Sequence, residues 1–303
     1  MSVLAIIAAL VLEQWRPLAD RKAYMALLAR WANWLENTFN AGETRQGAIA
    51  WAVAAAPLVV GSLVLYYVLL WIQPLLALAL NVLALYLTLG FRQFSHYFTG
   101  IQSAVKGEDM ERARALLGAW RGESAQHRTK EEVIRLAIEE ALLASHRHVF
   151  AVLFWFMLLP GPSGAILYRL AGFLARRWRD QGVFGAFAKK LHDMLEWPAA
   201  RLTATAFAVV GDFEDAVYCW RTQASAWADR NLGIVLAAGA GAMGVRLGMP
   251  LAEADGGVQP RPDLGVGDAA EVAFLDSTVG LLWRSLVVWV FLLAILTVAR
   301  ILG

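Results

Sequence analysis

The ionisable residues that could do chemistry gather in one stretch that leads into an apolar run. Asp193, Glu196 and Arg201 lie there within nine residues, and Trp197 lies between the acids and the arginine. Residues three or four apart are neighbours on a helix, so Asp193 lies beside Glu196 and Trp197 lies beside Arg201. Ionisable side chains at membrane depth are costly and are often functional. The stretch therefore predicts a polar site at the membrane face; a structural ion pair is the alternative.

Two other site-like patterns are better explained by packing and by surface charge. Residues 239–244 match G-x-G-x-x-G, but that fingerprint requires a strand, a turn and a helix within a βαβ unit, which the surrounding sequence does not predict. The same glycines are typical of close helix packing in membranes. His146 and His148 are two residues apart and face different sides of a helix. We predict neither a dinucleotide site nor a zinc site here.

Composition places the chain in a membrane. It is 59% hydrophobic and 17% charged, whereas a soluble domain has about 25% charged residues. The net charge of +2 gives no basis for a nucleic-acid partner. One cysteine, Cys219, excludes an internal disulfide framework and a four-cysteine zinc site. The partner predicted from composition is the lipid bilayer.

Uncharged runs locate the membrane segments. The run 46–91 has no charged residue and would be roughly 69 Å long as a helix, about twice a bilayer core of about 30 Å. Because proline breaks a helix, Gln73-Pro74 predicts a hairpin with spans near 48–71 and 74–90. Pro160-Gly161-Pro162 likewise predicts a re-entrant helical pair over 149–175. Shorter runs, at 1–12 (an uncleaved anchor), 202–211, 231–245 and 285–299, bring the expected total to about four to six membrane segments.

The charges predict the organisation of a single membrane domain over 1–303. Of the 27 Lys and Arg residues, 21 precede residue 202. By the positive-inside rule, 14–47 and 91–148 are cytoplasmic segments, built of amphipathic helices, and the acidic loop 249–282 lies outside. Thr129-x-x-Glu132 predicts a capping box at the start of one of these helices. We expect an all-α, polytopic protein of the inner (cytoplasmic) membrane.

Three motifs follow one another in the second half of the chain. The first is Leu153-Phe-Trp155 with Gly164-x-x-x-Tyr168-Arg169, and the second is His192-Asp193-x-x-Glu196-Trp197-x-x-x-Arg201-Leu-Thr-Ala. The third is Asn231-x-Gly233, followed by Ala240-Gly-Ala-Met-Gly-Val-Arg-Leu-Gly248. Together they resemble the CobD/CbiB family, the membrane-bound adenosylcobinamide-phosphate synthases, over about residues 91–284.

The resemblance implies an amide-forming ligase of cobalamin biosynthesis, which joins aminopropanol phosphate to a corrinoid carboxylate with ATP. It implies Asp193 and Glu196 as catalytic carboxylates, acting as base or metal ligands. It also implies that phosphate or substrate is bound by Arg147, Arg169, Arg201 and Asn231. We expect Asp193, Glu196 and Arg201 to converge near Arg169 in one pocket. MgATP is the expected cofactor if the ligase interpretation holds, and no metal ligand set is predicted.

Departures from the family pattern bear on activity. The family's acidic E-N-T-x-D-G motif aligns with Leu143-Ala-Ser-His146-Arg147-His148, its later Asn and Asp align with Gly172 and Ala175, and the first Asp of its D-D pair is His192. Mg²⁺ prefers carboxylate and phosphate oxygens, and an arginine stays charged at any working pH. We therefore expect weak or no ligase activity. The alternative is a non-catalytic, AmpE-like membrane protein that acts through a membrane partner in envelope or β-lactamase-related signalling. The residues themselves leave enzymatic activity and oligomeric state open.

Overall fold

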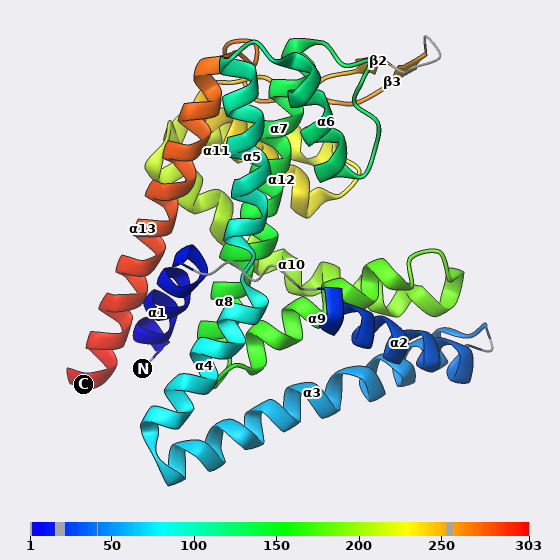
Figure 1. Ribbon diagram of the computed structural model, residues 1–303, viewed down its shortest axis with the longest axis vertical. Coiled ribbons are helices and arrows are strands. Elements are labelled where there is room, and N and C mark those ends of the chain that lie inside the picture. Colours follow the sequence, from blue (N-terminus) through cyan, green and yellow to red (C-terminus); the bar gives the residue numbers. More distant parts are fainter. Residues whose placement is uncertain (1, 16–21, 41, 253–256, 303) are drawn as a thin grey trace. The chain divides into compact units, whose positions relative to one another are not determined.

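The computed structural model describes residues 2–15, 22–40, 42–252 and 257–302 of the chain (Figure 1). These residues are overwhelmingly helical, as expected for an all-α membrane protein. They form two compact units, the first made of Met1–Gly90 with Ala151–Pro198 and the second of Phe91–Phe150 with Ala199–Gly303. Three helical segments of the described chain are long and apolar enough to cross a membrane: Thr44–Ile72, Lys130–Leu158 and Val272–Ala299.

The described residues of the first unit form six helices and the start of a seventh. They are α1 (Ser2–Trp15), α2 (Lys22–Phe39), α3 (Thr44–Ile72), α4 (Pro74–Thr88), α8 (Ala151–Leu158), α9 (Ser163–Arg177) and the first part of α10 (Gly182–Val210). Its core contains Trp178 and Phe184, which pack edge to face with 5.0 Å between ring centroids. Residue 47 must be glycine for the helices to pack this closely, because an added Cβ would lie 2.1 Å from the Phe184 carbonyl oxygen.

The predicted hairpin of α3 and α4 is confirmed. The two helices meet at Gln73, whose backbone is extended, and Pro74 begins α4 (Figure 1). Pro74 donates no hydrogen bond, which is tolerated in the first turn of a helix. Much of the outward face of α3 is exposed and apolar; Val64 and Trp71 are 56% and 88% exposed. Such a surface suits contact with lipid.

The predicted break at Pro160–Pro162 is also confirmed, because α8 ends at Leu158 and α9 begins at Ser163. Gly161 has φ of +61°, which suits glycine. A Cβ there would lie 2.5 Å from the Tyr66 ring, so the turn has no room for a larger residue. The side of the membrane on which the two helices end stays a prediction.

The second unit holds the remaining elements. Its helices are α5 (Phe91–Lys106), α6 (Met110–Arg121), α7 (Lys130–Ser145), the rest of α10, α11 (Phe213–Gln223), α12 (Arg230–Met243) and α13 (Val272–Leu302), with a π-helical turn at His146–Phe150 and a 3-10 turn at Ala224–Ala226. Its central helix, α7, is buried along most of its length, and the predicted capping box of Thr129 and Glu132 is present. Gly239 and Gly241 lie in α12 packed against Leu142 and the backbone of Asp215, which agrees with packing rather than nucleotide binding.

Two features of the second unit differ from what the sequence predicts. The π-helical turn joins α7 to α8 without a break, so one helical segment runs through residues 130–158. The segment expected to be a loop over 249–282 becomes helical at Val272, where α13 begins. Before α13, two antiparallel pairs of two-residue strands form: β1 (Leu247–Gly248) with β4 (Asp263–Leu264), and β2 (Leu251–Ala252) with β3 (Val258–Gln259).

Candidate functional site

Helix α10 carries the acids and the arginine of the second motif. It continues through Pro198, which lies inside the helix and leaves one backbone hydrogen bond unmade. Glu196 lies in the first unit, and Arg201 lies in the second.

Glu196 is 3% exposed and lies in a small polar cluster of the first unit. The Tyr168 hydroxyl donates to Glu196 Oε1 at 2.8 Å. His192 Nε2 lies 3.3 Å from the same oxygen, one helical turn earlier on α10. The Tyr168 and His192 rings are 5.8 Å apart. The first two motifs thus meet here, and the Trp155 indole also donates to the Leu195 carbonyl at 3.1 Å.

Asp193 and Arg169 lie in different surroundings. Lys189 Nζ lies 2.6 Å from Asp193 Oδ2, and both side chains are well exposed, at 70% and 39%. Exposed pairs of this kind contribute roughly 0–1 kcal/mol. Arg169 lines an apolar cavity with Phe173. The convergence of Asp193, Glu196 and Arg201 near Arg169 stays a prediction.

Arg201 and Asn231 lie together in the second unit. Arg201 Nη1 donates to Asn231 Oδ1 at 3.3 Å, although the two residues are 30 positions apart. Asn231 is in the first turn of α12, where Asp229 caps the helix by accepting from the backbone of Asn231 and Leu232. Partial burial and the nearby charge of Arg230 both lower the pKa of Arg201 from its usual value. Arg201 and Arg230 thus lie near this N-terminus. Because Asp229 already caps the backbone N–H groups, an anion such as phosphate would bind through the guanidinium groups.

The His146–His148 turn contains one buried and two half-buried side chains. His146 is fully buried, and its Nδ1 lies 2.9 Å from the Thr203 hydroxyl. Thr203 donates its proton to the Ala199 carbonyl at 3.0 Å, so the imidazole Nδ1 must be the donor to Thr203. His146 therefore joins this turn to α10. Arg147 instead interacts electrostatically with Glu140.

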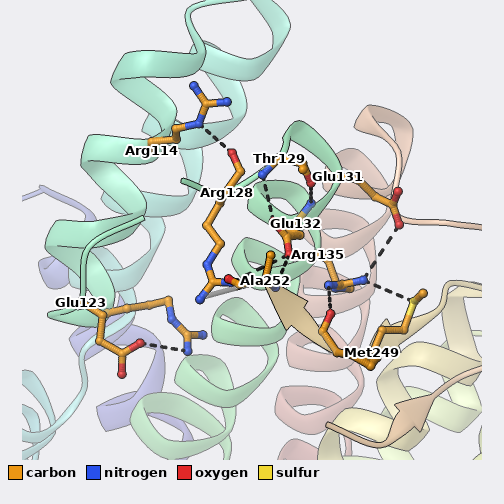
Figure 2. Close-up of polar contacts among 11 residues, drawn as sticks. Arg114, Glu123, Arg128, Thr129, Glu131, Glu132, Arg135, Met249 and Ala252 are labelled. Carbon is orange, nitrogen blue, oxygen red and sulfur yellow. Dashed lines mark hydrogen bonds and ion pairs between the residues drawn. The ribbon is translucent and has the colours of Figure 1, made fainter. Parts of the chain in front are cut away.

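Sequence reasoning missed a group of charged side chains on α7. Glu132, Arg135 and Glu139 are spaced three and four apart and are all at least nine-tenths buried. Their spacing within an apolar helix was the available signal, because three buried charges on one face require partners. Figure 2 shows the first part of this group, in which Glu132 accepts hydrogen bonds from the backbone of Thr129 and Ala252.

Several partners of this group come from the segment that precedes α13. Arg135 donates to the Pro250 carbonyl and to the Met249 sulfur, each at 3.3 Å (Figure 2). Glu139 accepts from the Gly248 backbone at 2.9 Å and from Arg261. Arg261 in turn lies over the Trp227 ring, 4.9 Å from its centroid. These contacts fasten the β1–β4 segment to α7.

Comparison with known proteins decides the family. The family model described as CobD/Cbib protein matches residues 6–282. The chain belongs to the CobD/CbiB family. It is 34% identical over 302 residues, 97% of both chains, to the Cobalamin biosynthesis protein CobD of Stutzerimonas stutzeri strain A1501. It is 35% identical to the protein of the same name from Chromobacterium violaceum, over 80% of this chain and 77% of that protein. No solved structure matches.

This chain differs from the CobD/CbiB pattern at two positions that lie against each other. In the alignment expected from the sequence, His192 stands in place of the first Asp of the family's D-D pair, and Gly172 stands in place of its Asn. A Cβ at Gly172 would lie 3.2 Å from His192 Cε1. The larger imidazole and the absent side chain are therefore complementary in space.

In the described parts of this CobD/CbiB chain, the His, Cys, Asp and Glu side chains do not form a protein cage for a metal. Among the described residues, no group of three or more His, Cys, Asp or Glu is placed to hold an ion. The buried carboxylates Glu132, Glu139 and Glu196 already accept hydrogen bonds from the protein. Mg²⁺ in nucleotide enzymes is commonly held by one or two carboxylates together with the phosphates. The described side chains therefore fit a cation that arrives with phosphates better than a resident ion.

Proposed function

We propose that this CobD/CbiB-family chain acts in cobalamin biosynthesis at the inner membrane, where it joins aminopropanol phosphate to a corrinoid carboxylate in an ATP-dependent, amide-forming reaction. The observation that carries the proposal is the pairing of Arg201 with Asn231 at the N-terminus of α12. Near-complete coverage of a relative named Cobalamin biosynthesis protein CobD supports the pathway. ATP supplies the free energy needed to expel a carboxylate oxygen.

Arg201 and Arg230 bind the phosphate of aminopropanol phosphate in this proposal. Hydrogen bonds between a guanidinium and a phosphate are charge-assisted and about twice as strong as neutral ones. Asn231 orients Arg201, since its side-chain oxygen accepts from Nη1. Burial and the nearby Arg230 lower the pKa of Arg201, but a guanidinium stays protonated in proteins. Binding the phosphate would offset the repulsion between the two guanidinium groups.

Glu196 and Asp193 are the candidate proton acceptors for the amine. The amine must lose a proton before it can form an amide bond, so a nearby carboxylate would assist. Glu196 is the stronger candidate because Tyr168 and His192 fix its position. Asp193 is exposed and paired with Lys189. We therefore expect Glu196→Gln to lower the rate more than Asp193→Asn.

Complementation tests the proposal. A bacterial strain that lacks its own synthase is grown on cobyric acid as sole corrinoid source, with this chain or a variant expressed at matched levels. We expect slow but measurable growth with the natural chain and none with Arg201→Ala. Arg112→Ala, which removes an exposed arginine of α6 in the same unit, is the matched control and should support growth like the natural chain. Absence of growth with well-expressed natural chain would contradict the proposal.

The second candidate is a non-catalytic, AmpE-like protein that acts through a membrane partner. It is favoured by the basic His146–His148 turn, which stands in place of an acidic motif. In that case, neither the natural chain nor any variant would support growth on cobyric acid. The purified chain would also bind no aminopropanol phosphate, because its arginines would serve only the fold and the partner.

A further inference from the structure

An apolar cavity of about 120 Å³ lies within the first unit. Helices α2, α3, α4 and α9 all contribute to its wall, with apolar side chains that include Met25, Leu28, Leu58, Leu87 and Phe173. An engineered apolar cavity of about 150 Å³ in another protein binds benzene. This cavity therefore has room for a short length of hydrocarbon chain.

Two arginines of α9 line the same cavity. Arg169 and Arg176 are seven residues apart, with Phe173 between them, so all three lie on one face of the helix. At 1.5 Å per residue the two arginines are about 10.5 Å apart along the helix axis. No Asp or Glu is among the residues that line the cavity. Its wall therefore combines an apolar surface with two positive charges, which suits a ligand with a hydrocarbon part and an anionic part.

Helix α2 indicates where this cavity lies relative to lipid. The Arg177 guanidinium donates to Asn33 of α2, with Nε 2.8 Å from Oδ1, and so holds α2 against α9. On α2, Trp31 and Trp34 are 38% and 53% exposed and stack with 5.3 Å between ring centroids. Tryptophan is enriched at the membrane–water interface, where lipid phosphates lie. An amphipathic helix with exposed tryptophans is typical of that interface.

We propose that this cavity binds an anionic phospholipid. Part of one acyl chain occupies the apolar cavity, and Arg169 and Arg176 bind the phosphate. Basic pockets between membrane helices are suited to anionic headgroups because the phosphate offsets the charge of the arginines. The family resemblance implies that Arg169 binds phosphate, and the apolar wall around it favours a lipid phosphate over the soluble substrate. This inference is independent of the substrate phosphate site proposed at Arg201 and Arg230, since it assigns Arg169 to a different ligand.

Native mass spectrometry of the purified full-length protein in detergent tests the proposal. The probes are dioleoylphosphatidylglycerol, which is anionic, and dioleoylphosphatidylcholine, which is zwitterionic and has the same chains. We expect the natural chain to bind the anionic lipid about 30-fold more tightly, which corresponds to about 2 kcal/mol for two arginines. The double variant Arg169→Gln, Arg176→Gln should lose this preference. The control Arg30→Gln, Arg179→Gln removes two exposed charges of the same unit outside the cavity and should keep it.

Two further experiments test whether the acyl chain occupies the cavity and whether the bound phosphate belongs to a lipid. Leu58→Trp fills the cavity and should weaken binding of both lipids, with Thr88→Leu as a second filling variant if the first fails to fold. An excess of inorganic phosphate should not displace the anionic lipid. Equal binding of both lipids, retained preference in the arginine double variant, unchanged binding in the filled cavity or displacement by inorganic phosphate would each overturn the proposal.

Discussion

Gly172 lies directly against the His192 imidazole, and a Cβ at residue 172 would come within 3.2 Å of His192 Cε1. Helices α9 and α10 can approach closely at this point because residue 172 has no side chain. His192 also reaches Glu196, at 3.3 Å. The contact therefore links a departure from the CobD/CbiB pattern to the buried carboxylate that we propose as proton acceptor.

Gly172→Asn should destabilise the protein by about 1–3 kcal/mol, because the added side chain overpacks against His192. Combined with His192→Asp, which shortens the opposing side chain, the same substitution should cost less. We expect a coupling of about 0.5–3 kcal/mol in a double-mutant cycle of thermal stability. Gly61→Ala, where nothing lies within 4 Å, controls for substitution at a helical glycine. Additive effects of the two substitutions would contradict the packing relationship.

Glu139→Ala should destabilise the second unit strongly, by about 3–5 kcal/mol, since it leaves Arg261 without its buried carboxylate. Asp276→Asn removes the carboxylate of the Lys106–Asp276 pair, whose side chains are 45% and 61% exposed. That change should cost less than about 1 kcal/mol. Melting temperatures of the two variants in detergent compare them directly. Similar losses would show that the Glu139 contacts do not fasten the β1–β4 segment.

Cys219 should resist thiol reagents in the native protein. Its side chain is fully buried, and burial, with the nearby Asp215 charge, raises its pKa to about 11. The reactive thiolate is the deprotonated form, so it is scarce at neutral pH and increases as the pH rises toward 11. We expect negligible maleimide labelling at pH 7.5 and full labelling after unfolding. Rapid labelling of the native protein would place Cys219 at an accessible surface.

Leu143 and Arg147 stand where the CobD/CbiB pattern has acidic residues, and substitution can restore those acids. Both are half-buried, whereas the three residues between them are buried, so the two side chains lie on one side of the helical segment. In the family pattern these positions carry Glu and Asp. Leu143→Glu with Arg147→Asp should raise ligase activity by about tenfold or more, because it restores carboxylates near which a cation and its phosphates can bind. The growth rate on cobyric acid measures the ligase activity of this variant. Unchanged or slower growth at an unchanged expression level would show that the basic turn is not the cause of weak activity.

The sequence predicted the elements that depend on local signals. Pro74 and the uncharged run gave the α3–α4 hairpin, and Pro160–Pro162 gave the break between α8 and α9. Thr129 and Glu132 gave the start of α7. In each case one or two residues determine the backbone, so a pattern in a short window is sufficient.

The sequence did not predict features that depend on distant partners. Glu139 is buried because Gly248 and Arg261 reach it from more than a hundred residues away. Asp193 and Glu196 are three residues apart, yet one pairs with exposed Lys189 and the other lies buried against Tyr168. Helical spacing gives neighbours on one helix but not the helix that covers them. The resemblance to CobD/CbiB pointed to Arg201 and Asn231 as binding residues, but neither the resemblance nor the spacing predicted that the two side chains pair.

The most direct test of the account is amide formation by the purified protein. Adenosylcobyric acid, aminopropanol phosphate and MgATP are incubated with the natural chain or with Arg201→Ala, and the product is quantified by mass spectrometry. We predict a slow but measurable product with the natural chain, and a KM for aminopropanol phosphate about 10–150-fold higher in Arg201→Ala, as expected for loss of a hydrogen bond to a charged group. Arg112→Ala should leave this KM unchanged. Absence of product with folded natural chain, or an unchanged KM in Arg201→Ala, would contradict the account.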